Sequence, residues 1–74
     1  PEFAEAYRNL SKVKKYKAKD PHIPQILSLY SRENLNPADK ARLGFALANI
    51  NKDLGNHDEY FKYLNEGNKL RKED

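Results

Sequence analysis

Histidine and serine side chains are the first candidates for chemistry in this sequence. His22 and His57 are the only histidines, and neither lies beside an array of ligands at metal-binding spacing. A metal site needs three or four converging ligands. None of the three serines that could act as nucleophiles lies on a recognisable nucleophile elbow; these are Ser11, Ser28 and Ser31. The sequence therefore predicts no metal site, no cofactor and no nucleophilic serine.

Three carboxylates near Gly55 are the remaining candidates for catalysis. Asp53, Asp58 and Glu59 lie close together in the sequence, and paired carboxylates can act as acid and base when burial separates their pKa values. Here they flank an expected exposed turn. Asp58 and Glu59 fall in the first turn of an expected helix, where negative charge is stabilising by about 0.3–1 kcal/mol. We therefore expect a structural role for them and no enzymatic activity.

A lysine cluster near the start of the chain suggests a different chemistry. The first 20 residues hold six Lys or Arg against three acids, which accounts for the whole net charge of +3. Such a cluster could follow a phosphate backbone while an interleaved tyrosine stacks on a base; the alternative interpretation is a solvated helix end. A small basic helical nucleic-acid-binding module is therefore the second functional hypothesis, with contacts from Lys12, Lys14, Lys15, Tyr16, Lys17 and Lys19.

Length and composition limit the class of protein. A chain of 74 residues with 38% apolar residues supports one domain with a thin core. It has no cysteine, which excludes disulfides, and no apolar run of the roughly 20 residues that cross a bilayer. We expect a soluble, cytoplasmic domain spanning residues 1–74 and excised from a longer protein. Pro1-Glu2-Phe3 is either native sequence or a cloning remnant.

Apolar spacing predicts helices. Phe3, Ala6, Tyr7, Leu10 and Val13 recur at steps of three and four, which places them on one helical face. A later segment has a wider apolar surface, which implies contacts on two sides; its members are Ala41, Leu43, Phe45, Leu47, Ala48, Ile50 and Leu54.

Capping residues separate these segments. Asp20 and Asn36 each precede a proline that suits a first helical turn. Gly55 can end a helix in the left-handed conformation, and Asn56 can cap the next helix. The sequence therefore predicts an all-α fold of about four helices in antiparallel helical hairpins, over residues 3–16, 22–33, 37–54 and 57–71.

Two segments resemble the tetratricopeptide repeat family. In residues 41–70, Leu47-Ala48 resembles the family's large-small pair, Gly55 its turn, and Leu64 and Gly67 its later large and small positions. In residues 4–11, Tyr7 resembles the aromatic position and Leu10-Ser11 the large-small pair. The resemblance implies that these eight residues pack the helices of the repeats together.

A narrower resemblance concerns bacterial tetratricopeptide regions that precede a sulfotransferase domain. It rests on residues 45–48, 53–56 and 63–68, read as FALA, DLGN and YLNEGN. This resemblance implies a parent protein that transfers sulfuryl groups. The fragment itself has no Gly-rich phosphate loop to hold the donor nucleotide.

Departures from the repeat pattern indicate an interaction surface. Asn51 replaces a usual aromatic and Tyr60 a usual alanine. Tyr60, Phe61 and Tyr63 cannot all point into one narrow core, so some of them face outward. We assign the interaction surface to Asn51, Tyr60 and Tyr63.

A non-catalytic protein–protein interaction or scaffold module is the function that this resemblance implies. The expected partner is a protein or peptide, another domain of the parent chain, or a second copy meeting an uncovered repeat face. We expect no cofactor and no membrane contact, and nucleic acid remains the alternative partner.

Overall fold

The computed structural model describes residues 2–73 and the side chains of residues 3–72. The prediction of an all-α fold with four helices is confirmed: the described residues contain no strand. The helices are α1 (Glu2–Val13), α2 (His22–Tyr30), α3 (Pro37–Leu54) and α4 (His57–Glu73). None of them is both long and apolar enough to cross a membrane in the part of the chain that is described. Pro1, the first residue of the segment of unsettled origin, lies outside the described residues.

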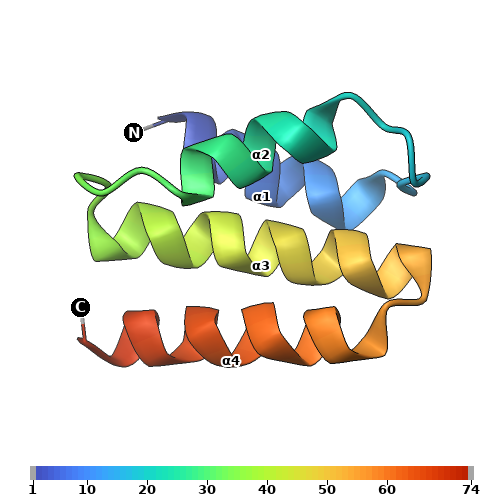
Figure 1. The fold of residues 1–74 in the computed structure, drawn as a ribbon. Helices are drawn as coiled ribbons and strands as arrows, with labels where there is room; N and C mark the ends of the chain where they lie inside the picture. The colour runs from blue at the N-terminus through green and yellow to red at the C-terminus, as the bar shows by residue number, and fades with distance from the viewer. Residues whose placement is uncertain (1, 74) are drawn as a thin grey trace.

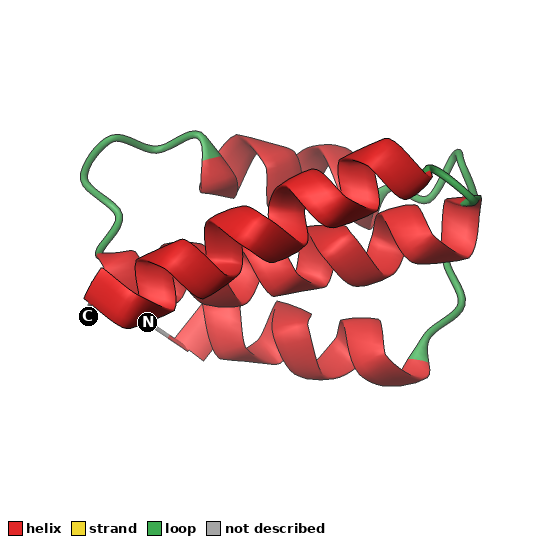
Figure 2. Ribbon diagram, turned by 90° about the horizontal axis from the view of Figure 1, so that it is seen from below, coloured by secondary structure: helices red, strands yellow, loops and turns green. Residues whose placement is uncertain are grey.

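Helix α3 lies at the centre, and the other three helices pack against it (Figure 1). Helix α4 runs antiparallel to α3 on one side, while α1 and α2 lie on the other side. Figure 2, in which α4 is nearest the viewer, shows that α1 and α2 lie apart from each other behind α4, one along each flank of α3. Helices α1 and α3 run in the same direction (Figure 1). Helices α1 and α2 contact each other less than either contacts α3.

The bounds of α3 are those predicted, because both ends are fixed by local chemistry. The side-chain oxygen of Asn36 accepts a hydrogen bond from the backbone nitrogen of Asp39 at 2.9 Å, as expected of a helix cap. Gly55 has a φ of 77° in the left-handed region, which glycine adopts without a steric penalty. The reversal after Leu54 lets α4 pack back along α3.

The first helix is shorter than predicted. It ends at Val13 and not at residue 16, because Tyr16 turns back into the core, where it is 4% exposed. Its backbone nitrogen donates to Asp53 Oδ2 at 3.1 Å, a bond to α3 that replaces one within a helix. Val13, expected on the apolar face, is 82% exposed, since Ala4 and Ser11 take the buried positions.

The other boundaries also differ. Helix α2 ends at Tyr30 and not at residue 33, because its last turn tightens: the nitrogen of Arg32 donates to Leu29 three residues back. Helix α4 continues two residues beyond the predicted 71. Helix α2 begins at His22, so Pro21 and not Asp20 is the residue that precedes it. The Asp20 carboxylate still caps the entry to the helix, since it accepts a hydrogen bond from the backbone nitrogen of His22 at 2.9 Å.

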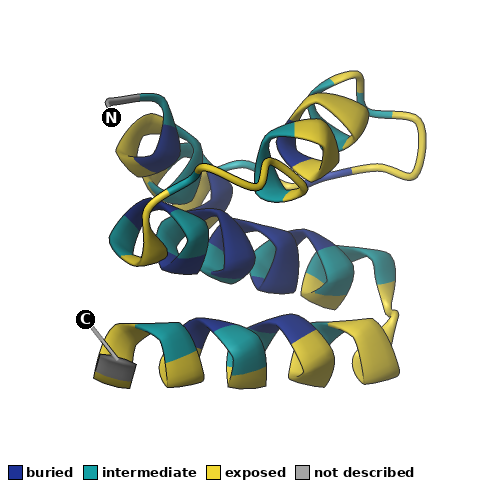
Figure 3. Ribbon diagram, turned by 60° about the vertical axis from the view of Figure 1, so that its left-hand side comes forward, coloured by how far each residue is buried: buried dark blue, intermediate teal, exposed yellow. Residues whose placement is uncertain are grey.

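The core is concentrated on α3, as Figure 3 shows. The Tyr30 ring of α2 passes beside Gly44 of α3 and reaches α4, where it packs edge-to-face on Tyr63 at 5.5 Å between centroids. The Tyr30 hydroxyl donates to Glu66. Burial, followed by that bond to Glu66, raises the pKa of Tyr30 well above its usual range. The buried apolar residues are Ala4, Tyr16, Ile26, Ala41, Leu43, Ala46, Leu47, Ala48, Ile50 and Tyr63.

The residues assigned to repeat packing lie in or beside this core. Leu47 and Ala48 are each 1% exposed, and Ser11 and Gly67 are also buried. The others are half-buried except for the exposed turn glycine, and they comprise Tyr7, Leu10, Leu64 and Gly55. Their positions are consistent with packing roles.

Replacing Ala48 with Leu should destabilise the fold by about 1–3 kcal/mol, because an isobutyl side chain must replace a methyl group in a filled core. Urea unfolding, followed by circular dichroism, measures this change in the free energy of unfolding. Ala6→Leu, on the exposed side of α1, is the matched control and should change stability by less than about 0.5 kcal/mol. Equal effects of the two substitutions would contradict this description of the α3 core.

Candidate functional site

Two adjoining hollows lie along the face that α1, α3 and α4 share. One is about 270 Å³ and the other about 250 Å³. Arg8 and Lys12 are one turn apart on α1, and Phe45 and Asn49 are one turn apart on α3, so the hollows follow one another along the same helices. We call this surface the basic groove and define it by Arg8, Lys12, Lys15, Arg42, Phe45, Asn49, Lys52 and Arg71.

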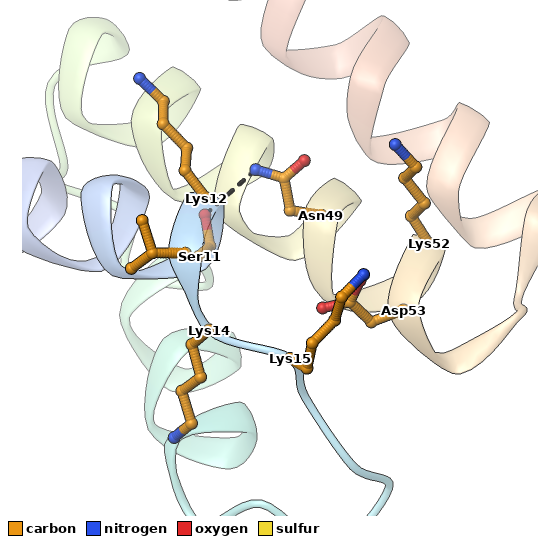
Figure 4. A pocket seen from close by; sticks show the side chains of 8 residues that line it. Ser11, Lys12, Lys14, Lys15, Asn49, Lys52 and Asp53 are labelled. Carbon is orange, nitrogen blue, oxygen red and sulfur yellow. Dashed lines mark hydrogen bonds and ion pairs between the residues drawn. The ribbon is translucent and has the colours of Figure 1, made fainter.

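Polar contacts between α1 and α3 form the floor of the basic groove. Asn49 Nδ2 donates to Ser11 Oγ at 3.2 Å, drawn as the dashed line in Figure 4. The same Ser11 hydroxyl donates to the backbone oxygen of Arg8 at 2.7 Å. The bond to Arg8 lies within α1 and orients the Ser11 hydroxyl, and the bond from Asn49 connects this buried residue to α3.

The lysine end of the groove lies at the carboxyl ends of α1 and α3. Lys12 and Lys52 extend to either side of Asn49 and point away from the floor (Figure 4). Each lies in the last turn of its helix, where a cation is favoured by the negative end of the macrodipole. Lys15 Nζ is 3.8 Å from Asp53. Helix stability therefore accounts for part of the charge at this end.

The arginine end of the groove surrounds a single aromatic ring. The guanidinium of Arg8 lies over Phe45 at 5.0 Å from the ring centroid. Arg42 Nη1 donates to the buried carboxylate of Asp39 at 3.1 Å, and Arg71 extends from the last turn of α4. Three helices thus bring three guanidinium groups to one hollow.

The groove holds more positive than negative charge. Seven cationic residues line the two hollows, although the ammonium of one of them, Lys14, is paired with Asp20. The carboxylates there are Asp53 and, behind Arg42, Asp39. Both carboxylates already accept hydrogen bonds, Asp53 from Tyr16 and Asp39 from Asn36 and Arg42. Arg8 and Arg71 pair with no carboxylate among residues 3–72. The surface will therefore attract anionic groups.

The lysine cluster predicted for nucleic acid does not form one surface. Lys12 and Lys15 line the groove, but Lys14 turns away to Asp20 at 2.7 Å, and Lys17 and Lys19 are exposed in the loop after α1. The prediction that Tyr16 stacks on a base is wrong, because its ring is buried.

The interaction surface predicted from Asn51, Tyr60 and Tyr63 is also incorrect in part. Tyr63 is 9% exposed and belongs to the core, and Tyr60 is half-buried against the core. Asn51 is occupied in the turn: its Nδ2 donates to Leu47 O at 2.8 Å, and its Oδ1 accepts from Asn56 at 3.2 Å. Phe61, 56% exposed, is the aromatic residue that faces outward.

The residues considered for catalysis stay apart. His22 lies beside Lys14, with 3.3 Å between its Nδ1 and the ammonium, while His57, Asp58 and Glu59 line an exposed hollow at the start of α4. Residues 3–72 contain no group of three His, Cys, Asp or Glu side chains that could hold a metal ion. Ser31 donates to the backbone of its own helix at Leu27.

Sequence reasoning identified only Lys12 and Lys15 among the eight residues that define the groove. Arg42, Phe45, Asn49 and Lys52 follow a spacing of three, four and three, which marks one helical face. That spacing was available in the sequence but was masked by the apolar residues that surround it. The contribution of Arg71 depends on how α4 packs, so no local pattern indicates it.

Comparisons with known proteins add no identification. The chain matches no family model, no curated protein and no solved structure. The tetratricopeptide resemblance therefore rests on the residues given above.

Glycine substitutions test how Phe45 is held at the floor. A Cβ at Gly67 would lie 2.9 Å from Phe45 Cε1, whereas one at Gly44 would meet Tyr30 at an ordinary 3.4 Å. Gly44→Ala should therefore gain up to about 1 kcal/mol from helix propensity, and Gly67→Ala should gain nothing because Phe45 must move. Thermal unfolding compares the two; an equal rise in Tm for both would contradict the close Phe45–Gly67 contact.

Acid unfolding tests the Asp20 cap. Hydrogen bonds from Lys14 and from the backbone of His22 lower the pKa of the Asp20 carboxyl. Its contribution is present above the unfolded pKa of about 3.9 and is lost as the pH falls through the lower folded value. Asp20→Asn should flatten the loss of Tm below about pH 4. Glu33→Gln, at an exposed carboxylate, is the control and should show the same dependence of Tm on pH as the wild type. If Asp20→Asn also shows the wild-type dependence, the cap is contradicted.

Proposed function

We propose that this chain is a non-catalytic protein–protein interaction module of the tetratricopeptide kind, which holds a partner in the basic groove. The supporting observation is the parallel arrangement of α1 and α3 (Figure 1), whose solvent-facing rows line two hollows one after the other. Because each hollow is below the roughly 300–1,000 Å³ of typical small-molecule sites, an elongated partner fits this surface better than a compact ligand.

The packing of α3 on α4 supports the repeat interpretation. Ala48 is buried in the core, Gly55 makes the tight turn, and Gly67 lets Phe45 approach α4. A helical pair of this kind buries more of its apolar surface when a neighbouring repeat or domain covers it. The module would then serve a larger protein, which the resemblance suggests carries a sulfotransferase domain. Its partner is a peptide, another domain of that protein or a second copy.

Nucleic acid is the second candidate partner, and the excess of cations in the groove favours it. Single-stranded nucleic acids also need aromatic rings for their bases to stack on. Tyr16 is buried, and Phe45 is already covered by Arg8. A protein partner is therefore the better supported of the two.

Selection from a displayed random peptide library tests the proposed function. Selected peptides should shift the amide NMR signals of groove residues on α1 and α3. Asn49→Trp fills the middle of the groove and should weaken their binding at least about tenfold, because the large side chain takes the partner's place. Asn65→Trp, on the exposed side of α4, is the matched control and should have no effect.

Circular dichroism must show the same helix content in both variants. Peptides that bind Asn49→Trp as tightly as the wild type, or whose shifts map to the surface around Phe61, would contradict the assignment of the groove.

A further inference from the structure

We infer that the basic groove selects an acidic, extended segment of its partner, with a carboxylate held at the arginine end. This inference rests on the proposed function and specifies the chemistry of the partner. It follows from the charge of the groove, the origin of its arginines and its length.

Helix stability explains the arginine end only in part. Arg71 lies in the last turn of α4, where a cation is favoured, and Arg42 pairs with Asp39 on its own helix, but Arg8 has neither explanation. Arg42 lies in the second turn of α3 and Arg8 in the middle of α1, where the macrodipole does not favour a cation. Arg8 and Arg71 have no ion pair within residues 3–72, and they come from the first and last helices. Only packing in three dimensions brings them to the same hollow, and each exposes a guanidinium that can hold a carboxylate through two parallel hydrogen bonds.

Phe45 gives the arginine end an apolar floor. Its ring is half-buried, rests against Gly67 and is covered on one face by Arg8. Arg42 is held beside it by the buried carboxylate of Asp39, which uses one of its five donors. An acidic residue next to an apolar residue would therefore match this end: the carboxylate meets the guanidinium groups, and the apolar side chain meets the part of the half-buried ring that Arg8 does not cover.

The length of the groove fits a short extended segment. Ten residues separate Arg42 from Lys52 on α3, which at 1.5 Å per residue gives about 15 Å. An extended chain rises about 3.3 Å per residue, so about five residues cover this distance. Cations at both ends, Arg8 and Arg71 at one and Lys12 and Lys52 at the other, favour a segment with more than one acid.

Synthetic peptides test this inference on the intact chain. The probe is a peptide of about eight residues, enough to span the groove, that alternates Glu with Leu. Its control replaces every Glu with Gln, and a single-stranded oligothymidine of equal charge represents nucleic acid. Fluorescence anisotropy measures affinity at low and moderate salt, and amide NMR shifts locate the bound probe.

Arg8→Gln/Arg71→Gln should weaken binding of the Glu peptide about tenfold or more, because two carboxylate contacts are lost. Lys17→Gln/Lys19→Gln removes the same charge from the exposed loop and should change binding less than about twofold, since salt screens distant charges. Because Arg8 also packs on Phe45, Arg71→Gln alone serves as a second variant and should retain the wild-type fold while binding more weakly. The Gln peptide should bind at least about tenfold more weakly than the Glu peptide.

The inference is overturned if the Gln peptide binds as tightly as the Glu peptide, if the two double variants weaken binding equally, or if no Glu peptide binding is detected. Library peptides that still occupy the groove would then leave the proposed function standing. Tighter binding of oligothymidine, mapped to the groove, would overturn both the inference and the proposed function. Sedimentation showing that the groove is instead buried between two copies of the chain would identify the occupant as the chain itself and overturn the inference.

Discussion

Packing against α3 is the constraint on which the rest of this structure depends. Three helices contact α3, whereas contacts among those three are few. A helix with neighbours on several sides cannot present one apolar stripe; it must be apolar or small almost all round. Helix α3 meets this requirement with alanine and glycine between larger residues, so that neighbouring backbones approach closely. Substitutions that enlarge these positions affect more than one helix contact at once.

The same constraint creates the groove. Only part of the α3 circumference is left uncovered, and that part carries the polar residues of the helix. Helix α1 lies along one side of this strip, and the end of α4 lies on the other. Because Asn49 donates to the buried Ser11, α1 is connected to α3 by a hydrogen bond as well as by packing. The surface is therefore built into the fold and does not depend on a loop.

The sequence predicts most of the fold because the signals for helix ends are local. Asn36 and Gly55 fix α3 through a cap and a left-handed residue, and the structure has both. The end of α1 was wrong because Tyr16 belongs to the core through a contact with Asp53, 37 residues away. Sequence spacing carries no information on such a contact. The same reason explains Tyr63, which pairs with Tyr30 beside Gly44.

The candidate site was harder to predict than the fold. The lysine cluster was visible as a run in the sequence, but Lys12 and Lys14 point to different sides, because α1 ends at Val13 between them and Lys14 pairs with Asp20. The arginine end was not visible, since Arg8, Arg42 and Arg71 lie far apart from one another in the sequence. Whether the chain is a tetratricopeptide module remains a prediction, because the residues that carry the resemblance are those that any close helical pair requires.

The one-sided packing of α4 has a consequence for cooperativity. Apart from the Tyr30 contacts with Tyr63 and Glu66, α4 is held by α3 alone. A helix with few buried contacts opens locally at a lower free energy than the whole domain unfolds. Amide hydrogens near the end of α4 should then exchange sooner than those of α3, while the Ser11–Asn49 connection persists. In such an open state the groove keeps its lysines but loses Arg71. Binding of a partner at the arginine end is therefore coupled to the local opening of α4, although α4 forms no part of the groove floor.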